Sequence, residues 1–276
     1  MHPILIDKPF GIDFITIHTF GLVVVIAFLT GSWLAGRLAA QSGLDKEQIA
    51  NLALYLLLVG IVGARLAYVA VNFDQFRHAP WTRIFQIWEG GIVWYGGMLA
   101  ATLFAFLWLR RAKIPLWPAV DALIVGTFFG LGFARWGCFF AGCCYGAECS
   151  APWGVSFSDP RSVVGQEYEQ LGRSLPTPSL HPTQIYSSIA AFAIAAILVR
   201  MHARKRFEGQ VFATGLVIYP VGRFIIEIFR ADRTRGSILG LLSASQELSV
   251  LVLVIGVTVY LLRARAARAA TPAPAT

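Results

Sequence analysis

Three arginines lie in sequence that is otherwise too apolar to carry charge. Arg65 (in GARLAY), Arg135 (in GFARWG) and Arg223 (in VGRFIIEIFR) fall within or at the edge of hydrophobic runs. An arginine at the centre of a membrane helix costs about 2.5–3.5 kcal/mol, so such residues normally face an interior cavity and have partners. A guanidinium group grips phosphate through two parallel hydrogen bonds. The pattern therefore favours an anion site, and in a bilayer the obvious anion is a phospholipid phosphate.

Further polar residues surround Arg223 at helical spacing. Glu227 follows it by one turn and can form an ion pair with it, and Arg230 continues the same face. Tyr219 precedes Arg223 by one turn and can share its cavity. The alternative is that Arg223 and Glu227 only tie helices together. Three arginines gathering toward one side of the membrane favour the anion site over that interpretation.

All four cysteines occupy twelve residues just after Arg135, as Cys138, Cys143, Cys144 and Cys149. The spacing C-x4-C-C-x4-C matches neither the C-x2-C pairs of a zinc ribbon nor a C-x-x-C redox pair. We do not expect adjacent Cys143 and Cys144 to ligate one metal with the other two, so the sequence predicts no metal. Structural disulfides, for which four cysteines allow three pairings, and free thiols that shape or serve the site both stay open.

Two other motifs place polar or small residues next to apolar runs. In EGGIVWYGG (89–97), Gly96 and Gly97 would let a lipid or a neighbouring backbone approach closely. Tyr95 in the same motif belongs either to the site or to an interfacial aromatic belt. HPTQIY (181–186) begins a helix, and His181 there is either a general base or a hydrogen-bonding group at the helix start.

The elements that position these residues are membrane helices. The chain has 276 residues, of which 57% are hydrophobic and 14% charged, whereas soluble domains carry about 25% charged residues. A membrane span needs roughly 20 mostly apolar residues. The sequence therefore predicts an all-α integral membrane protein with seven transmembrane helices. Their approximate ranges are 15–36, 48–71, 91–109, 117–134, 183–199, 211–229 and 245–262.

The distribution of charge predicts the orientation. One set of predicted loops carries twelve Lys and Arg residues and three acidic residues. The other set carries eight Lys and Arg residues and nine acidic residues. The first set is therefore cytoplasmic, which places the N-terminus outside and the C-terminus in the cytoplasm. The net charge of +8 is dispersed over these loops and forms no single stripe, so no nucleic-acid partner is expected.

The long connection between the fourth and fifth predicted spans is the exception among short loops. Residues 137–180 are polar and rich in Gly and Pro after the cysteines, which predicts a small extracytoplasmic head inserted in one membrane domain (1–264). The N-terminus lacks a basic region, so no cleaved signal peptide is expected. The tail 265–276 is expected to be disordered and cytoplasmic.

Over residues 15–263 the chain resembles the bacterial prolipoprotein diacylglyceryl transferase family. The most specific of the motifs that carry the resemblance are the last three in this list: HTFGL (18–22), GARLAYV (63–69), WEGGIVWYGG (88–97), GLGFARWGCFFAGCCYG (130–146), HPTQIY (181–186) and GRFIIEIFRAD (222–232). The resemblance implies transfer of the diacylglyceryl group of phosphatidylglycerol to the lipobox cysteine of a preprolipoprotein. A thioether forms and glycerol-1-phosphate leaves. It also implies no cofactor, and we expect a monomer.

By position, the resemblance assigns roles to several residues. Arg135 and Arg223 match the family's essential arginines and would grip the phosphate. Tyr219 and Glu227 match residues that support that site, and Arg230 aligns with a further arginine of the family. Gly146 ends the signature loop.

The residues that depart from the family pattern are those that would meet the acceptor, the thiol of the lipobox cysteine. The family has a histidine, proposed as the base for the substrate thiol, where this chain has Tyr95, and a tyrosine where it has Phe20. A tyrosine with a pKa of about 10 is a poor base at neutral pH but a serviceable hydrogen bonder. In the signature loop, Cys138, Ala141 and Cys143 replace two asparagines and a glutamate. The alternatives are therefore a paralogue with another acceptor, a membrane thiol oxidoreductase or a lipid-binding protein.

Overall fold

The structure is a computed structural model that describes residues 3–7, 16–77, 79–87, 90–230 and 242–270. Long helices dominate these residues, with one two-stranded antiparallel sheet near the N-terminus. In chain order the elements are β1 (Ile4–Asp7), β2 (Thr16–His18), α1 (Thr19–Gln41), α2 (Lys46–Val71), α3 (Phe73–Phe76), the 3-10 helix η2 (Trp81–Phe85), α4 (Trp94–Arg111), α5 (Leu116–Ala141), α6 (Val163–Gln170), α7 (Thr183–His202), α8 (Gln210–Ile228) and α9 (Ala244–Ala270).

The predicted membrane spans fall on seven of these helices. Within the described ranges, six helices are long and apolar enough to cross a membrane, namely α1, α2, α5, α7, α8 and α9. The predicted span 91–109 falls on α4, which is not among the six. α4 has 18 residues, begins with Trp94 and Tyr95 and ends with Arg110 and Arg111, so its apolar middle is short. The protein is a helical integral membrane protein.

Three boundaries differ from the prediction. The all-α prediction omits β1 and β2, because residues 16–18 were assigned to the first span. α5 continues to Ala141, so the first residues of the predicted head (137–180) are helical, and it ends at Gly142, whose φ of +70° suits glycine. The predicted disordered tail is helical as far as Ala270, because alanine and arginine are strong helix formers. Residues 271–276 lie outside the described residues.

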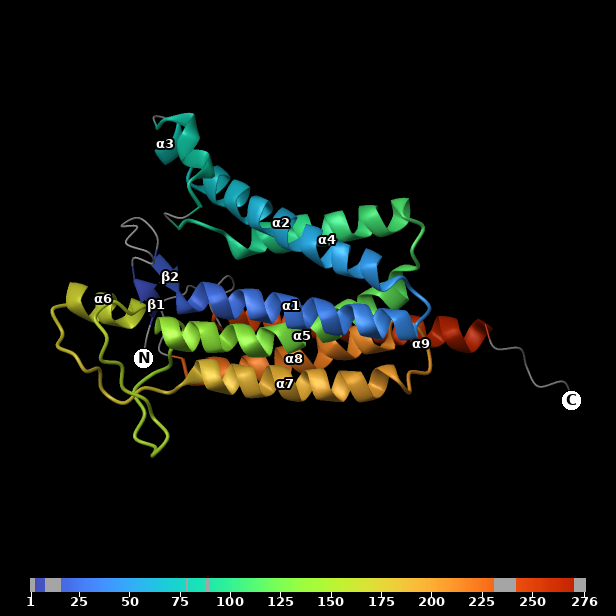
Figure 1. The fold of residues 1–276 in the computed structure, drawn as a ribbon. Helices are drawn as coiled ribbons and strands as arrows, with labels where there is room; N and C mark the ends of the chain where they lie inside the picture. The colour runs from blue at the N-terminus through green and yellow to red at the C-terminus, as the bar shows by residue number, and fades with distance from the viewer. Residues whose placement is uncertain (1–2, 8–15, 78, 88–89, 231–241, 271–276) are drawn as a thin grey trace, which may run out of the picture.

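Helices α1, α5, α7 and α8 lie side by side as a bundle (Figure 1), and α9 packs on α8. Glycines bring α1 and α5 into backbone contact. A Cβ atom added to Gly126 would lie 2.4 Å from the carbonyl oxygen of Gly31, and one on Gly130 would lie 2.7 Å from that of Ala27. The buried core lies toward one end of the bundle, where α1 and α7 end and α5 and α8 begin. Its larger members include Leu38, Ile49, Leu52, Leu109, Val125, Phe128, Leu198 and Val211.

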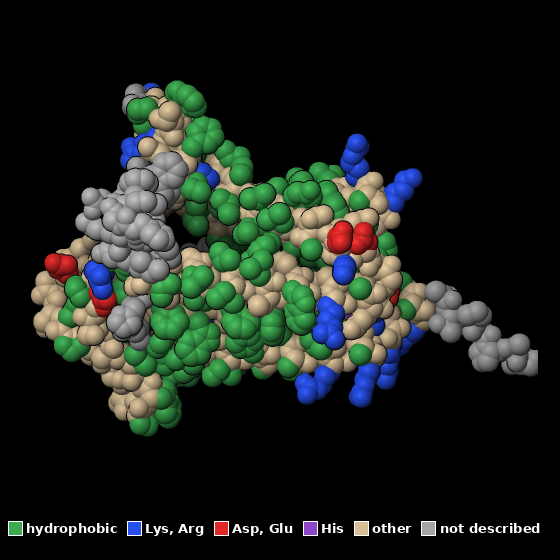
Figure 2. Space-filling view, viewed as in Figure 1, with side chains coloured by type: hydrophobic (Ala, Val, Ile, Leu, Met, Phe, Trp, Pro, Cys, Tyr) green, Lys and Arg blue, Asp and Glu red, His purple; other side chains and the backbone are tan. Residues whose placement is uncertain are grey.

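Helices α2 and α4 form a separate pair that leans away from the bundle (Figure 1). Small residues hold the pair together. A Cβ atom on Gly96 would lie 2.2 Å from the Cβ of Ala67, and one on Gly97 would lie 2.6 Å from the carbonyl oxygen of Gly60. Small residues at such interfaces let helix backbones approach closely in membranes. Figure 2 shows a hollow between this pair and the bundle.

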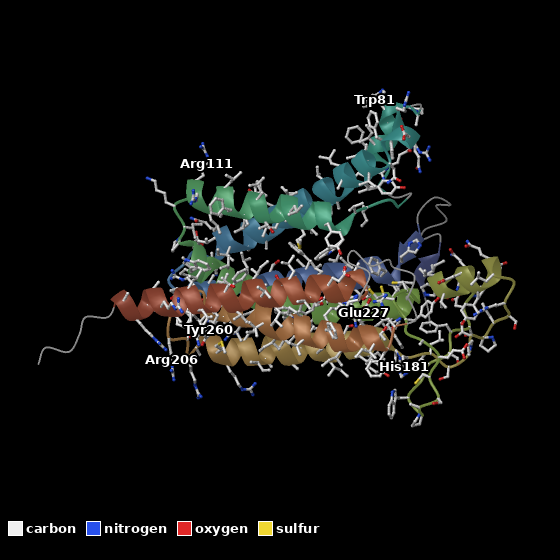
Figure 3. All side chains as sticks on the ribbon, turned by 180° about the vertical axis from the view of Figure 1, so that it is seen from behind. Trp81, Arg111, His181, Arg206, Glu227 and Tyr260 are labelled. Atoms are coloured by element: carbon white, nitrogen blue, oxygen red, sulfur yellow. The ribbon has the colours of Figure 1, made fainter. Side chains whose placement is uncertain are left out.

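The two ends of the molecule differ in composition. Figure 2 shows Lys and Arg side chains gathered at the end where α9 terminates, opposite α6. Figure 3 places Glu227 and His181 toward the end that carries α6, and Arg206 and Arg111 toward the other. Beyond the helices, residues 142–182 form a small unit around α6 with a hydrophobic cluster of its own, made of Phe157, Val164, Tyr168 and Leu180.

A buried carboxylate joins α5 to the start of α8. Asp121 is fully buried, and its two oxygens accept hydrogen bonds from the backbone N–H groups of Gly209 (2.9 Å) and Phe212 (2.8 Å). The ammonium group of Lys205 lies 3.4 Å away. Because first-turn N–H groups have no partner within their own helix, Asp121 caps α8 from a neighbouring helix. The sequence analysis assigned no role to this residue.

Replacing Asp121 with alanine removes this cap and leaves the Lys205 ammonium without a buried counter-charge. Loss of a helix cap costs about 0.5–2 kcal/mol, so we expect Asp121→Ala to lower the Tm of the purified protein in detergent. Asp74→Ala is the matched control, because the Asp74 side chain is 93% exposed. Equal melting temperatures for the two variants would contradict the capping role.

Candidate functional site

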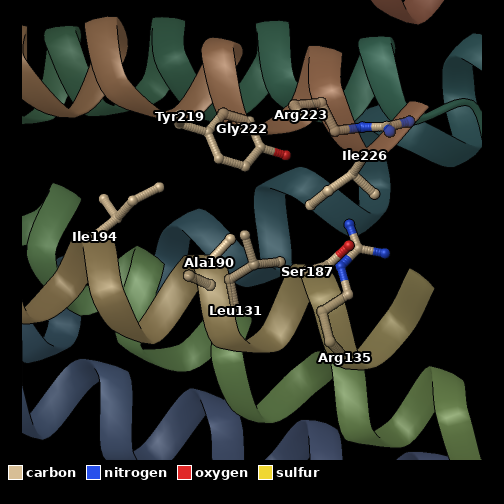
Figure 4. Close-up of a pocket in the computed structure, with 10 residues that line it drawn as sticks. Leu131, Arg135, Ser187, Ala190, Ile194, Tyr219, Gly222, Arg223 and Ile226 are labelled. Atoms are coloured by element: carbon tan, nitrogen blue, oxygen red, sulfur yellow. The ribbon is translucent and has the colours of Figure 1, made fainter. Parts of the chain in front are cut away.

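The two arginines that the sequence singled out line one narrow cleft between α5, α7 and α8 (Figure 4). Arg135 comes from α5, Ser187 from α7, and Tyr219 and Arg223 from α8. Figure 4 shows both guanidinium groups toward one end of the cleft and Ile194 toward the other. The rest of the lining is apolar or small: Leu131, Ala190, Ala191, Gly222 and Ile226. The cleft therefore has a cationic end and an apolar end.

Arg135 brings a buried donor to this cleft. Its Nε is buried and has no hydrogen-bond partner among the residues that the structure describes. A buried donor without an acceptor costs about 1–3 kcal/mol, and more when the group is charged. An anionic group in the cleft would supply the missing acceptor.

Arg223 is held by the carboxylate that its spacing predicted. Its NH1 lies 2.5 Å from Oε2 of Glu227, whose side chain is 5% exposed, so the predicted ion pair is confirmed. The same oxygen lies 4.0 Å from Nε of Arg230, and the Ser243 hydroxyl donates to the other oxygen at 3.4 Å. Glu227 thus fixes the Arg223 guanidinium, which remains 17% exposed. Tyr219 lines the cleft one turn away, with its ring 5.3 Å from that of Phe128.

The cysteine loop follows directly after α5. All four cysteines lie in the described part of the chain, and all four are free thiols. The Sγ atoms of Cys138, Cys143 and Cys144 lie within 4.8 Å of one another. Adjacent Cys143 and Cys144 thus converge with Cys138, while Cys149 lies outside this group. Cys144 has a φ of +59°, which turns its side chain away from the alternating directions of an extended chain.

Hydrogen bonding and charge act strongly on these thiols. Hydrogen bonds from the thiols of Cys138 and Cys143 hold the pKa of Cys144 well below its usual range, and the positive charges of Arg230 and Arg135 act in the same direction. The hydrogen-bonding interaction with Cys138 raises the pKa of Cys143. The positive charges of Arg230 and Arg135 therefore favour negative charge on the cysteine loop.

The start of α7 holds this loop in place. The Gln184 amide donates to the carbonyl oxygen of Cys143 (2.7 Å), and the Thr183 hydroxyl donates to that of Cys144 (2.6 Å). Both side chains are buried. The sequence analysis missed them, together with Ser187. The sequence could have indicated these residues, because all three are polar and lie in the first turns of an otherwise apolar helix.

Gly146 passes between α7 and the end of α8. Its N–H donates to the carbonyl oxygen of His181 (2.9 Å), and the N–H of Ala147 donates to that of Phe229 (2.9 Å). A Cβ atom on Gly146 would lie 2.4 Å from the Phe229 carbonyl oxygen and 2.6 Å from the Cβ of His181. Only glycine fits this passage without moving the backbone.

His181 is engaged outside the cleft lining. Its Nδ1 lies 3.1 Å from the hydroxyl of Tyr186, and its ring lies 5.2 Å from that of Phe229. The Tyr186 hydroxyl also accepts a hydrogen bond from Trp153 (2.8 Å). These contacts favour the interpretation of His181 as a hydrogen-bonding group at the helix start.

Arg65 is not brought to the cleft. Its guanidinium donates four hydrogen bonds of 2.6–2.9 Å to backbone carbonyl oxygens of the segment before α4, those of Arg83, Ile84, Gly90 and Gly91. Arg65 is 6% exposed and also lies over the rings of Tyr68 and Phe76. Arg65 therefore binds a loop, and its donors are used by the protein itself.

The predicted residues of α4 also lie outside the cleft. Gly96 and Gly97 face α2, so the close approach that they permit is to a neighbouring backbone. Tyr95 is 45% exposed, and its ring lies 5.4 Å from that of Trp94. The structure thus brings together Arg135, Tyr219, Arg223 and Glu227, and places the cysteine loop beside them.

The sequence was compared with known families. The family described as prolipoprotein diacylglyceryl transferase matches residues 8–262. The chain belongs to this family. The expectation drawn from the motifs is thereby confirmed.

Relatives from several bacteria cover nearly the whole chain. A phosphatidylglycerol–prolipoprotein diacylglyceryl transferase of Clostridium tetani is 30% identical over 260 residues, which are 94% of this chain and 97% of that protein. One of Symbiobacterium thermophilum is 33% identical over 245 residues, 88% of this chain and 87% of the relative. The second such enzyme of Clostridium perfringens is 30% identical over 258 residues, 93% and 94% of the two chains.

The close packing of Gly146 between α7 and the end of α8 can be tested by adding one methyl group. Gly146→Ala places a Cβ against the Phe229 backbone, so the loop or the end of α8 must shift, and we expect the Tm to fall by several degrees. Gly21→Ala is the matched control, because no described atom other than its own neighbours lies within 4 Å of that Cβ. If both variants have the same Tm as the wild type, the close packing around Gly146 does not require glycine at this position.

Proposed function

We propose that this protein transfers the sn-1,2-diacylglyceryl group of phosphatidylglycerol to the lipobox cysteine thiol of preprolipoproteins. Membership of the family and the names of its relatives support a transferase of this kind. The observation that carries the proposal is the buried Nε of Arg135, which has no partner among the described residues and lies in the same cleft as Arg223. A buried cationic site open at an apolar cleft suits the phosphate of a lipid.

The reaction places a charge where these arginines lie. The bond between the glyceryl carbon and the phosphate oxygen breaks, and that oxygen leaves with the electron pair as part of glycerol-1-phosphate. The acceptor sulfur forms a bond to the same carbon, and the thiol proton is released. Guanidinium groups fixed in a dry site stabilise the extra negative charge on the departing phosphate without reorganising.

The residues of the cleft divide this task. Arg135 and Arg223 bind the phosphate, and Glu227 keeps Arg223 in position through the 2.5 Å ion pair. Arg230, on the other side of Glu227, adds positive charge at the same end. Tyr219 offers its hydroxyl one turn from Arg223. The reaction needs no cofactor and no metal.

The other predicted residues act by positioning. Arg65 fixes the segment that leads into α4, and Gly96 and Gly97 hold α4 against α2. Together they hold the start of α4, where Tyr95 is 45% exposed. Tyr95 there hydrogen-bonds the acceptor thiol and does not act as its base. Gly146 keeps the cysteine loop against α7 and α8.

An apolar groove on the other side of α8 suits an acyl chain. It runs between α8 and α9 and is lined almost wholly by hydrocarbon: Pro220, Val221, Phe224, Ile225, Ser249, Val250 and Leu253. Phe224 follows Arg223 directly, so a chain in this groove lies within one helical turn of the phosphate site. A lipid bound at both places would have its headgroup and tail on two faces of α8.

The same proposal includes the membrane topology. At about 1.5 Å per residue, the 18 residues of α4 extend about 27 Å, close to the bilayer core of about 30 Å, so we count α4 as the seventh span. The arginine-rich end of α9 lies in the cytoplasm and residues 142–182 form the extracytoplasmic head. The protein works as a monomer in the bacterial inner membrane.

Removing either guanidinium should abolish transfer. We expect Arg135→Gln and Arg223→Gln to lower the rate by about 10²–10³, the usual cost of losing a donor to a developing anion. Thioether product on a lipobox peptide would be measured by mass spectrometry in phosphatidylglycerol vesicles. Arg77→Gln is the matched control, because the Arg77 side chain is 55% exposed and pairs only with nearby Asp74 among the described residues. Full activity in either cleft variant would contradict the proposal.

The Tyr95→Phe variant removes only the hydroxyl, so it tests whether Tyr95 forms a hydrogen bond with the acceptor thiol. Loss of one hydrogen bond of about 1.4 kcal/mol corresponds to about a tenfold lower rate, and we expect this loss in kcat/KM for the peptide while lipid KM is unchanged. Tyr55→Phe, on α2 and packed against Phe104 and Trp108, is the matched control. Wild-type kinetics in Tyr95→Phe would remove Tyr95 from the site.

A further inference from the structure

The transfer chemistry proposed above assigns no role to the three converging thiols of the cysteine loop. Cys138 lies in the last turn of α5, and Cys143 and Cys144 follow the helix end at Gly142. We propose that these three cysteines form a three-thiolate binding site for a soft monovalent cation, Cu⁺. The proposal rests on the geometry of the loop and goes beyond the proposed transferase function.

The sulfur separations fit one ion. Metal–thiolate bonds are about 2.3 Å long, so three sulfurs around a central ion lie about 4.0 Å apart. The three Sγ atoms lie within 4.8 Å of one another, so closing onto an ion requires only small movements. The carbonyl groups of Cys143 and Cys144 are already fixed by Gln184 and Thr183. The loop is therefore preorganised, which lowers the cost of binding.

The donor set selects the ion. Thiolates are soft ligands that prefer Cu⁺, Zn²⁺ and iron–sulfur clusters. A structural zinc site is closed by four protein ligands. In the described part of the chain, no further Cys, His, Asp or Glu joins this group of three. Cys149 lies outside it. Three-coordinate sulfur is a normal environment for Cu⁺.

The surrounding charges balance the site. Three thiolates around one monovalent cation carry two negative charges, and the guanidinium groups of Arg135 and Arg230 both act on Cys144. Glu227 lies 4.0 Å from Nε of Arg230 and is paired more closely with Arg223. Binding replaces the thiol protons with the cation. Neither copper nor sulfur changes its oxidation state.

The test uses the full-length protein, purified in detergent, reduced and kept without oxygen. Cu⁺ is titrated against a chromogenic Cu⁺ chelator, and X-ray absorption at the copper edge counts the sulfur neighbours. We expect one ion per chain with three sulfur ligands. Cys138→Ser and Cys144→Ser should each weaken binding more than about 100-fold, since losing even an outer-shell partner costs about 10–100-fold. Cys149→Ser is the matched control and should bind as the wild type does.

Several results would overturn the proposal. They are no retention of Cu⁺ by the wild type, equal affinity in all variants, a copper ion with two or fewer sulfur neighbours, or tighter retention of Zn²⁺ than of Cu⁺ in the same competition. Thiol labelling before reduction gives a further check, because a disulfide among the three cysteines leaves no site. Since copper binding is measured without lipid or peptide, its failure is distinct from failure of the transferase function.

Discussion

A concentration of positive charge at membrane depth is the constraint on which the rest of this structure depends. Arg135, Arg223 and Arg230 lie at one end of the helices with Glu227 as the carboxylate between two of them. Charge at membrane depth is costly without partners, and the buried Nε of Arg135 has no hydrogen-bond partner among the residues that the structure describes. An added anion would supply that partner. We propose that the phosphate of a lipid is this anion, and the guanidinium groups would stabilise the extra negative charge with which it departs.

The remaining parts of the molecule keep this end open and the other end closed. The buried core and the Asp121 cap join the helices at the end where α9 terminates, and close glycine contacts join α1 and α5 near the middle of both helices. At the other end the α2–α4 pair diverges, and Arg65 is used to fix the segment before α4. We propose that the hollow between the α2–α4 pair and the bundle leaves room for two substrates, a lipid and a peptide.

The helices and half of the site follow from sequence, because they depend on local spacing. Apolar runs place the long helices, and the separation of four residues places Glu227 on Arg223. Features that depend on tertiary contact do not follow. The partners of Arg65 lie about 18–26 residues away in an irregular segment, and Asp121 caps a helix about 90 residues later. The three thiols converge in a loop with positive φ angles at Gly142 and Cys144 and with hydrogen bonds to α7, which no spacing rule reveals.

The central claim is that the arginine cleft binds the phosphate of a lipid. Native mass spectrometry of the purified protein, offered equal amounts of phosphatidylglycerol and diacylglycerol with matched acyl chains, tests it most directly. The wild type should retain phosphatidylglycerol strongly over diacylglycerol, and Arg135→Gln should lose that preference while still retaining lipid through its apolar surfaces. Equal retention of the two lipids by the wild type, or an unchanged preference in Arg135→Gln, would contradict the account.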